Sequence, residues 1–206
     1  MTRGLFYCLR YDLLFMKGLH LNRMHRNMDI SSAIERSDRM EKVIIIGCPG
    51  SGKSTFGRKL ERITGLPLYH LDMMFWNEDR TTVPKELFIE RLQETMSNSK
   101  WIIDGNYGGS MEMRIKECDT VFFLDYPTEV CIDGVELRKG KPRSDMPWFE
   151  KDNIDDDFIS FINNYNSESR PKVIGLLKKY SSKEIIVFHS RAESEEYLSS
   201  LKKNCI

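Results

Sequence analysis

The sequence has no hydrophobic run long enough to cross a membrane and no excess of charge of either sign. Its longest apolar runs, such as residues 43–46, have the length of a strand, whereas a membrane-spanning helix needs about 20 apolar residues. The 31 Lys and Arg residues balance 31 Asp and Glu residues, which excludes a uniformly basic nucleic-acid coat and an acidic solvating tail. With 40% hydrophobic and 11% aromatic residues, the chain can bury a core, so we expect a soluble folded domain.

The sequence also lacks the cysteine spacing of a covalent or metal-bound framework. Its five cysteines are odd in number and form no C-x-x-C pair. This pattern excludes a disulfide framework and a zinc site, and it is typical of a reducing cytosol. We therefore expect a cytoplasmic protein.

Residues 1–39 differ in composition from the rest of the chain. They contain seven Lys and Arg against four Asp and Glu, which leaves 24 basic and 27 acidic residues for the remainder. Their apolar stretch is interrupted by Arg10 and Asp12, unlike a secretory signal. We interpret 1–39 as an N-terminal extension, either unstructured or weakly helical or a mis-assigned start, and 40–206 as the folded domain.

A phosphate-binding loop follows the first predicted strand, residues 43–46. The next residues match G-x-x-x-x-G-K-[ST], in which the glycines turn backbone N–H groups towards phosphate oxygens. Lys53 is expected to reach the β- and γ-phosphates, and the Ser54 hydroxyl to bind Mg²⁺. The motif predicts binding of ATP and Mg²⁺ by Gly47, Pro49, Gly50, Ser51, Gly52, Lys53, Ser54 and Thr55. Cys48, inside the loop, is interpreted as structural.

Strand-like and helix-like segments alternate through the rest of the chain. Further strands are predicted at 66–71, 101–104, 120–125 and 184–188, and helices include 84–96 and one capped by Ser190. Five strands that alternate with helices predict a three-layer α/β fold with a parallel sheet. Ligands of such folds lie beyond the carboxyl ends of the strands, where Asp72, Asp104 and Asp125 are found.

Two of these aspartates are alternatives for the ligand of the Mg²⁺ waters. Asp125 follows four apolar residues, as in a Walker B strand, whereas Asp104 ends the third strand, which usually lies beside the P-loop strand in P-loop kinases. We favour Asp104. Asp125 is then expected to begin the turn into the next helix.

Asp72 and the aromatic tract after it are candidates for a site that binds a phosphoryl acceptor. A carboxylate there can orient or deprotonate a hydroxyl, and Trp76 can form an apolar wall, although such a tract can equally belong to the core. The glycine-rich loop after Asp104 adds Gly105, Asn106 and Tyr107 as candidate substrate-binding residues, or else forms a tight connection. In the helix that follows, Arg114 is expected to face solvent.

A basic segment at 138–143 suits a mobile loop over transferring phosphates. Phosphoryl transfer depends on positioning and on positive charge at the γ-phosphoryl group. Arg138 and Arg143 from this segment and Arg170 from a later helix are therefore candidate catalytic residues, in a lid over about 138–157. The alternative is a solvated loop, and the acidic run at 155–157 is interpreted as a solvated helix start.

Several strings together resemble the bacterial DNA topology modulation proteins, in the adenylate-kinase-like branch of P-loop proteins. They are the P-loop, His70-Leu71-Asp72, residues 101–107 and 122–127, and the Arg143-Ser144-Asp145-Met146-Pro147-Trp148 string, within about residues 40–201. The resemblance implies a nucleotide-kinase-like fold with a small helical lid. Nucleoside monophosphate kinases carry an arginine in the string that begins with Asp-Gly, and here Gly108 replaces it, which disfavours an AMP-like acceptor.

Two functions are consistent with these residues. The first is an ATP-dependent kinase for a small-molecule, nucleotide-like acceptor. The second is a nucleotide-binding regulator that influences DNA topology directly or through a partner. The excess of three acidic residues in 40–206 and the lack of a recognisable DNA-binding motif argue against tight direct binding to nucleic acid.

Overall fold

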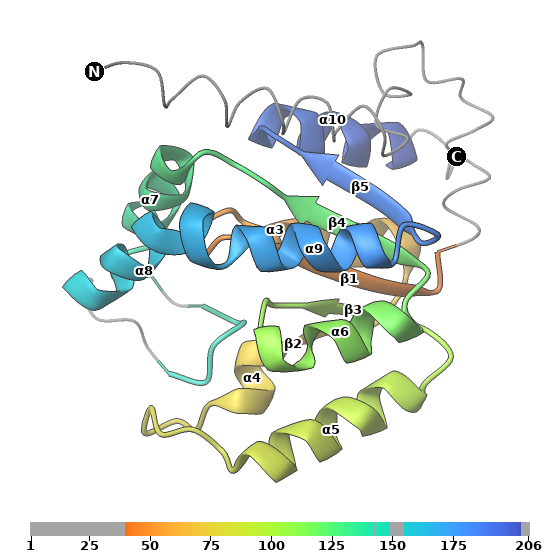
Figure 1. Cartoon of the computed structure of the whole chain (residues 1–206), viewed down its shortest axis with the longest axis horizontal. Coiled ribbons are helices and arrows are strands. Elements are labelled where there is room, and N and C mark those ends of the chain that lie inside the picture. The colour runs from red at the N-terminus through yellow and green to blue at the C-terminus, as the bar shows by residue number, and fades with distance from the viewer. Residues whose placement is uncertain (1–39, 142, 149–154, 203–206) are drawn as a thin grey trace.

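The computed structural model describes residues 40–141, 143–148 and 155–202. The predicted extension at 1–39 lies outside the described residues, as do positions 142 and 149–154 of the predicted lid. Figure 1 shows one sheet with helices on both sides. None of the described helices combines the length and hydropathy that a membrane-spanning helix needs.

Five strands form one parallel sheet, as predicted. They are β1 (Lys42–Gly47), β2 (Leu68–His70), β3 (Trp101–Asp104), β4 (Thr120–Leu124) and β5 (Glu184–Phe188). Their order is β2-β3-β1-β4-β5, so β1 lies in the centre between β3 and β4. All residues of β3 and β4 are buried, as the near-continuous apolar runs of these strands require.

Helices cover both faces of the sheet and complete the predicted three layers. Val43 and Ile45 of β1 pack on the face of α3 (Lys53–Thr64), α7 (Thr128–Glu136), α8 (Asp156–Glu168) and α10 (Arg191–Lys202). Ile44 and Ile46 pack on the face of α4 (Leu71–Phe75), α5 (Lys85–Ser97), α6 (Gly108–Glu117) and α9 (Arg170–Lys179). This alternation follows from the two-residue period of a strand. All four side chains are fully buried, which contributes about 1.5–3 kcal/mol each.

Two predicted boundaries need correction near the candidate acceptor site. The strand predicted at 66–71 is shorter, because β2 ends at His70 and the chain turns at once into α4. Asp72 therefore lies in the first turn of a helix and not at the end of a strand. In the first turn, its negative charge interacts favourably with the helix dipole. The helix predicted at 84–96 is α5, which begins one residue later because Pro84 precedes it as the cap.

The predicted helix starts are confirmed in most of their detail. Before α10, the Ser190 hydroxyl accepts a hydrogen bond from Glu193 N at 3.2 Å, while the Glu193 carboxylate accepts from His189 N at 2.8 Å. In a standard capping box the glutamate accepts from the backbone N–H of the cap residue itself, here Ser190, whereas Glu193 accepts from the residue before it. The acidic run begins α8 as predicted, with Asp155 accepting from Asp157 N at 3.0 Å.

Candidate functional site

The P-loop joins β1 to α3 at the carboxyl edge of the sheet. Gly50 and Gly52 have positive φ angles of 83° and 94°, which residues with a β-carbon rarely adopt. A Cβ atom at Gly50 would also lie 2.0 Å from the carbonyl oxygen of Cys131 on α7. Close packing against α7 therefore holds the loop shape. Cys48 is buried, and its contact with the Cys131 thiol, together with burial, raises its pKa, in keeping with a structural role.

Asn106, a predicted substrate-binding residue, instead contacts the end of β1. Its Nδ2 donates to the Gly47 carbonyl oxygen at 2.7 Å, and its Oδ1 accepts from Gly47 N at 3.0 Å. Both ends of the amide are thus bonded to one P-loop residue. Asn106 connects the loop after β3 to the P-loop.

Lys53 and Ser51 lie in the loop that is predicted to bind phosphate. Lys53 Nζ donates to the carbonyl oxygens of Gly47 at 3.0 Å and Cys48 at 3.1 Å, which holds the ammonium group over the loop. Burial lowers the pKa of Lys53, and the carboxylates of Asp104 and Asp72 oppose this shift. Ser51 is 1% exposed, and its Oγ has no hydrogen-bond partner among the described residues. Since buried polar atoms are normally paired, this hydroxyl fits a phosphate oxygen.

Asp104, the carboxylate favoured for the Mg²⁺ waters, has one bonded and one unbonded oxygen among the described residues. Its Oδ1 is 2.8 Å from Nδ1 of His70, and its buried Oδ2 has no hydrogen-bond partner among the described residues. Burial alone would lower the pKa of His70, but the hydrogen bond and charge of Asp104 more than offset this and raise it. Within the described ranges, no group of three His, Cys, Asp or Glu side chains could hold a metal. The unpartnered Oδ2 of Asp104 fits a water-mediated contact with Mg²⁺, which keeps several waters and uses few protein ligands.

Asp125 has a different partner. Because β3 and β4 both flank β1, adjacency does not separate the two aspartates. The two aspartates differ in their contact with Arg170, whose Nε and Nη2 donate to the two oxygens of Asp125 at 2.8 and 2.9 Å. This bidentate pair joins α9 to the end of β4. Arg170, predicted to act on the transferring phosphoryl group, is thus bound to a carboxylate beside the site.

Asp72 and Tyr107 form the polar part of the predicted acceptor site. The Tyr107 hydroxyl donates to Asp72 Oδ1 at 2.6 Å. Burial raises the pKa of both Asp72 and Tyr107. The positive charge of Lys53 reaches Asp72 and partly opposes its shift. The pair therefore lies between the P-loop lysine and the aromatic tract.

Aromatic side chains adjoin this pair. The rings of Phe75 and Tyr107 are 4.8 Å apart, and Trp76 meets Trp148 edge to face at 5.0 Å. The Arg80 guanidinium lies 5.9 Å from the centre of the Trp148 ring. Because Trp148 comes from the predicted lid segment, that segment reaches the acceptor side of the site.

The prediction that Arg114 faces solvent is wrong. Arg114 is fully buried and donates to the carbonyl oxygens of Gly105 at 2.8 Å, of Asn106, and of Tyr107 at 3.4 Å. Burial lowers its pKa to about 10, so it remains charged at neutral pH. A Cβ atom at Gly105 would lie 2.9 Å from the Leu71 Cβ, which accounts for the glycine there. Arg114 thus supports the loop that carries Tyr107.

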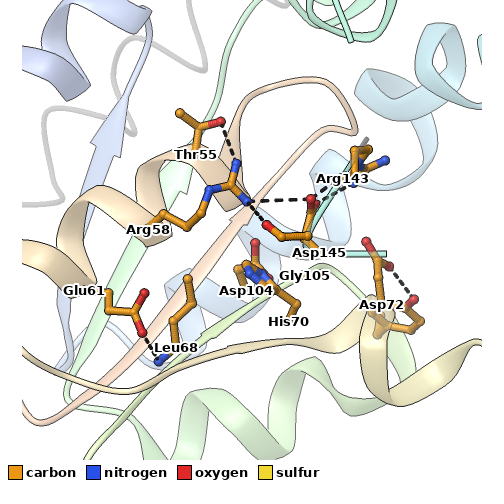
Figure 2. A network of polar contacts seen from close by, with 12 residues as sticks. Thr55, Arg58, Glu61, Leu68, His70, Asp72, Asp104, Gly105, Arg143 and Asp145 are labelled. Carbon is orange, nitrogen blue, oxygen red and sulfur yellow. Dashed lines mark hydrogen bonds and ion pairs between the residues drawn. The ribbon is translucent and has the colours of Figure 1, made fainter. Parts of the chain in front are cut away.

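The predicted lid arginines have different environments. Arg143 donates to both oxygens of Asp145, at 3.3 Å from Nε and 2.6 Å from Nη2, whereas Arg138 lies 5.9 Å from the ring centre of Phe158. The described residues of 138–148 form turns and loop, and helix resumes with α8. Figure 2 shows Arg143 and Asp145 above Asp104 and His70.

Comparison with known proteins finds similarity to two kinases. The chain has a P-loop kinase-like fold. No family model matches it. It is 28% identical over 120 residues, 54% of its length, to the adenylate kinase of Thermotoga maritima, and it spans about half (53%) of that relative. A crystal structure of shikimate kinase from Bacteroides thetaiotaomicron is 20% identical with a TM-score of 0.47, over 80% of this chain and 97% of that one.

The resemblance to the DNA topology modulation proteins is not shown by these comparisons and stays a prediction. The structure adds three polar residues to the site that motif analysis did not include. They are His70, Arg58 and Asp145, and each contacts a predicted site residue or its neighbour. His70 and Asp145 lie inside strings that carried the resemblance, which is the only sequence signal that pointed to them.

Proposed function

We propose that the protein is an ATP-dependent phosphotransferase that transfers the γ-phosphoryl group of ATP to a hydroxyl group of a small-molecule acceptor. The placement of Asp72 carries this proposal. Its carboxylate is hydrogen-bonded to Tyr107 among aromatic side chains, and it remains within electrostatic reach of Lys53 in the P-loop. A phosphate-binding lysine and a carboxylate at one edge of the sheet can activate a hydroxyl against a phosphoryl group. The similarity to an adenylate kinase supports the same reaction class.

The P-loop provides the nucleotide half of the site. Lys53, the Ser51 hydroxyl and the backbone N–H groups of the loop would bind the phosphates of ATP. Ser54 would bind Mg²⁺ directly, and Asp104 would bind it through water. When bound, Mg²⁺ supplies positive charge that offsets the charge developing on the phosphate oxygens.

Asp72 serves as the general base in this proposal. The acceptor hydroxyl oxygen bonds to the γ-phosphorus while the bond from that phosphorus to the β–γ bridging oxygen breaks. The hydroxyl proton passes to Asp72, and ADP is the leaving group. The raised pKa of Asp72 brings it closer to that of an effective base, and the hydrogen bond from Tyr107 fixes the orientation of the carboxylate.

The side chains around Asp72 favour an acceptor that presents a hydroxyl and has an apolar or planar part. Trp76 and Trp148 supply aromatic surface. Gly108 replaces the arginine that would hold a second phosphate, and the nearby Arg114 is bonded to backbone carbonyls. A nucleoside fits these groups better than a nucleoside monophosphate.

A two-stage binding experiment tests the proposal. ATP with Mg²⁺ should raise the melting temperature, and nucleosides and nucleoside monophosphates are then added to the same samples, because a ligand that binds the native state raises apparent stability. Compounds that raise the melting temperature further are then assayed for ADP formation. Absence of any shift with ATP and Mg²⁺ would contradict the proposal, and ATP binding without acceptor-dependent ADP formation would favour the regulatory alternative.

A further inference from the structure

Three segments of the fold meet at the carbonyl group of Gly50 in the P-loop. Arg191, the first residue of α10, donates from Nη2 to the Gly50 oxygen at 3.2 Å. The same Nη2 donates to the carbonyl oxygen of Val130 in α7, also at 3.2 Å. One guanidinium group therefore connects the P-loop to α7 and α10, although Gly50 lies 141 residues from Arg191 along the chain.

Gly134 of α7 leaves the room that this contact needs. A Cβ atom at Gly134 would lie 2.1 Å from the Gly50 oxygen and 2.6 Å from Arg191 Nη2. Glycine is a poor helix former, so the close approach of the loop and the guanidinium accounts for its presence in α7. The carbonyl group of Gly50 thus faces α7 and α10.

The peptide unit between Gly50 and Ser51 is held at both of its polar groups. Arg191 binds the carbonyl oxygen, and the Ser51 N–H donates to the Cys48 carbonyl oxygen at 3.1 Å. Because a peptide unit is planar, these two bonds fix its orientation. That orientation sets the position of the Ser51 side chain, whose buried Oγ has no hydrogen-bond partner among the described residues.

The guanidinium group also extends along the loop towards Lys53. Its Nη1 lies 3.5 Å from the position that a Cβ atom would take at Gly52, the residue before Lys53. Asn106 already holds the other end of the loop through both polar groups of Gly47. Arg191 provides the corresponding support in the middle of the loop.

We propose that Arg191 is a positioning residue for phosphate binding, which holds the Gly50 carbonyl against α7 and thereby keeps the P-loop, with the Ser51 hydroxyl, in the shape that binds phosphate. This inference rests on the proposed function, because it needs a nucleotide phosphate at the P-loop. Arg191 acts through the peptide unit after Gly50 and does not itself contact the ligand.

The test is calorimetric titration of wild-type protein and Arg191→Met with ATP and with inorganic tripolyphosphate, each with Mg²⁺. Methionine keeps an unbranched apolar side chain and removes the donors, and since Arg191 is exposed the variant should fold. We expect the affinity for both ligands to fall about 10-fold, which corresponds to one hydrogen bond of a charged group. The loss should be equal for the two ligands, because the loop binds only their phosphates.

A matched control and a salt series separate this role from long-range attraction. Arg62→Met removes the same charge from an exposed position in the last turn of α3 and should bind both ligands as the wild type does. The affinity ratio of wild type to Arg191→Met should persist at high salt, which screens a direct bond much less than a distant surface charge. Arg191→Lys, which retains a donor, should bind more tightly than Arg191→Met.

Gly134→Ala disturbs the same contact from the side of α7. Its Cβ atom would displace the Gly50 carbonyl from Arg191, so phosphate affinity should fall in this variant as well. In the Gly134→Ala background, Arg191→Met should add little further loss, because contacts of one network are not additive. A full additional loss would show that Arg191 does not act through the Gly50 carbonyl.

The outcomes distinguish the two proposals. A wild-type chain that binds neither ATP nor tripolyphosphate overturns the proposed function. A wild type that binds both, together with an Arg191→Met variant of equal affinity, overturns only the role of Arg191, and a lower melting temperature of that variant would then show that Arg191 merely fastens α10. A loss confined to ATP would mean that Arg191 contacts the nucleoside part, and a ratio that vanishes at high salt would mean that it only attracts the anion; either result contradicts the positioning role.

Discussion

The phosphate side of the site comes from one continuous stretch, β1 to the first turn of α3, whereas the acceptor side is assembled from segments far apart in the sequence. Asp72 comes from α4, Tyr107 from the loop after β3, and Trp148 from the loop before α8. The first region is shaped by backbone geometry and the second by side-chain contacts. A single change should therefore disable the phosphate side as a whole but impair the acceptor side in separable steps.

A polar contact joins the two regions. The Asn106 side chain is hydrogen-bonded to the backbone N–H and carbonyl groups of Gly47. Charge also acts across the boundary, because Asp72 and Asp104 both oppose the lowering of the Lys53 pKa. Binding of nucleotide and chemistry at the acceptor should thus be separable by mutation, and the following changes test that separation.

Lys53→Ala should have the largest effect. It removes the ammonium group held over the loop by Gly47 and Cys48, and with it a charge-assisted bond to phosphate of about 1.5–3 kcal/mol. ATP affinity should fall about 10- to 150-fold by calorimetry, and ADP formation should be lost. Lys59→Ala, on the exposed part of the same helix and paired with Glu195, is the matched control and should bind ATP normally. Unchanged ATP affinity in a folded Lys53→Ala would contradict the P-loop assignment.

Asp72→Asn should preserve ATP binding and lower turnover about 10²–10⁴-fold, the usual contribution of a general base. The amide keeps the size and loses the charge. In the wild type, turnover should fall as the pH falls through the raised pKa of Asp72, since the protonated carboxyl cannot accept a proton. Asp72→Asn should lack this inflection.

The melting temperature of the same variant tests the alternative role of Asp72 as a helix-start residue. A carboxyl with a raised folded pKa is ionised at a cost, so above its unfolded pKa the charge lowers the free energy of unfolding. Asp72→Asn should then melt at or above the wild-type temperature at pH 7. A lower melting temperature with full turnover would mean that Asp72 is structural.

Gly50→Ala tests whether the shape of the phosphate side depends on close packing. The added Cβ would meet the Cys131 carbonyl, and alanine is strained at a φ of 83°, so we expect a loss of about 3 kcal/mol in denaturant unfolding. Gly175→Ala in α9 is the control, because nothing lies within 4 Å of its Cβ position and helix propensity should raise stability by about 0.5–1 kcal/mol. Equal effects of the two changes would show that α7 does not constrain the P-loop.

The two regions also differ in how well the sequence predicts them. The β1 strand and the P-loop can be predicted from consecutive residues, because a run of β-branched residues and the spacing of the glycines are local signals. Arg114 was assigned wrongly because an arginine is rarely fully buried, and only the fold reveals the carbonyl oxygens that it satisfies. The position of Asn106 depends on a contact with Gly47, 59 residues away, and that of Asp145 on a contact with Arg58, 87 residues away, which periodicity and motifs cannot specify.

Removal of residues 1–39 should have the smallest effect, namely no change in melting temperature or ATP affinity. Met40 is 5% exposed and packs in the same core cluster as Val43. Glu41 and Lys42 donate from their backbone N–H groups to Asp119 Oδ2 at 3.0 and 2.6 Å. A chain that starts at Met40 keeps all these contacts.

A chain that starts at Val43 provides the comparison for this last prediction. It loses the buried Met40 side chain, worth about 2–5 kcal/mol for a large apolar residue in a core, and both hydrogen bonds to Asp119. Thermal melts of the two truncated chains and the full chain should therefore place the domain boundary between Met40 and Val43. A chain from Met40 that loses its cooperative melt would show that 1–39 belongs to the folded unit, because every described contact of the core is still present in it.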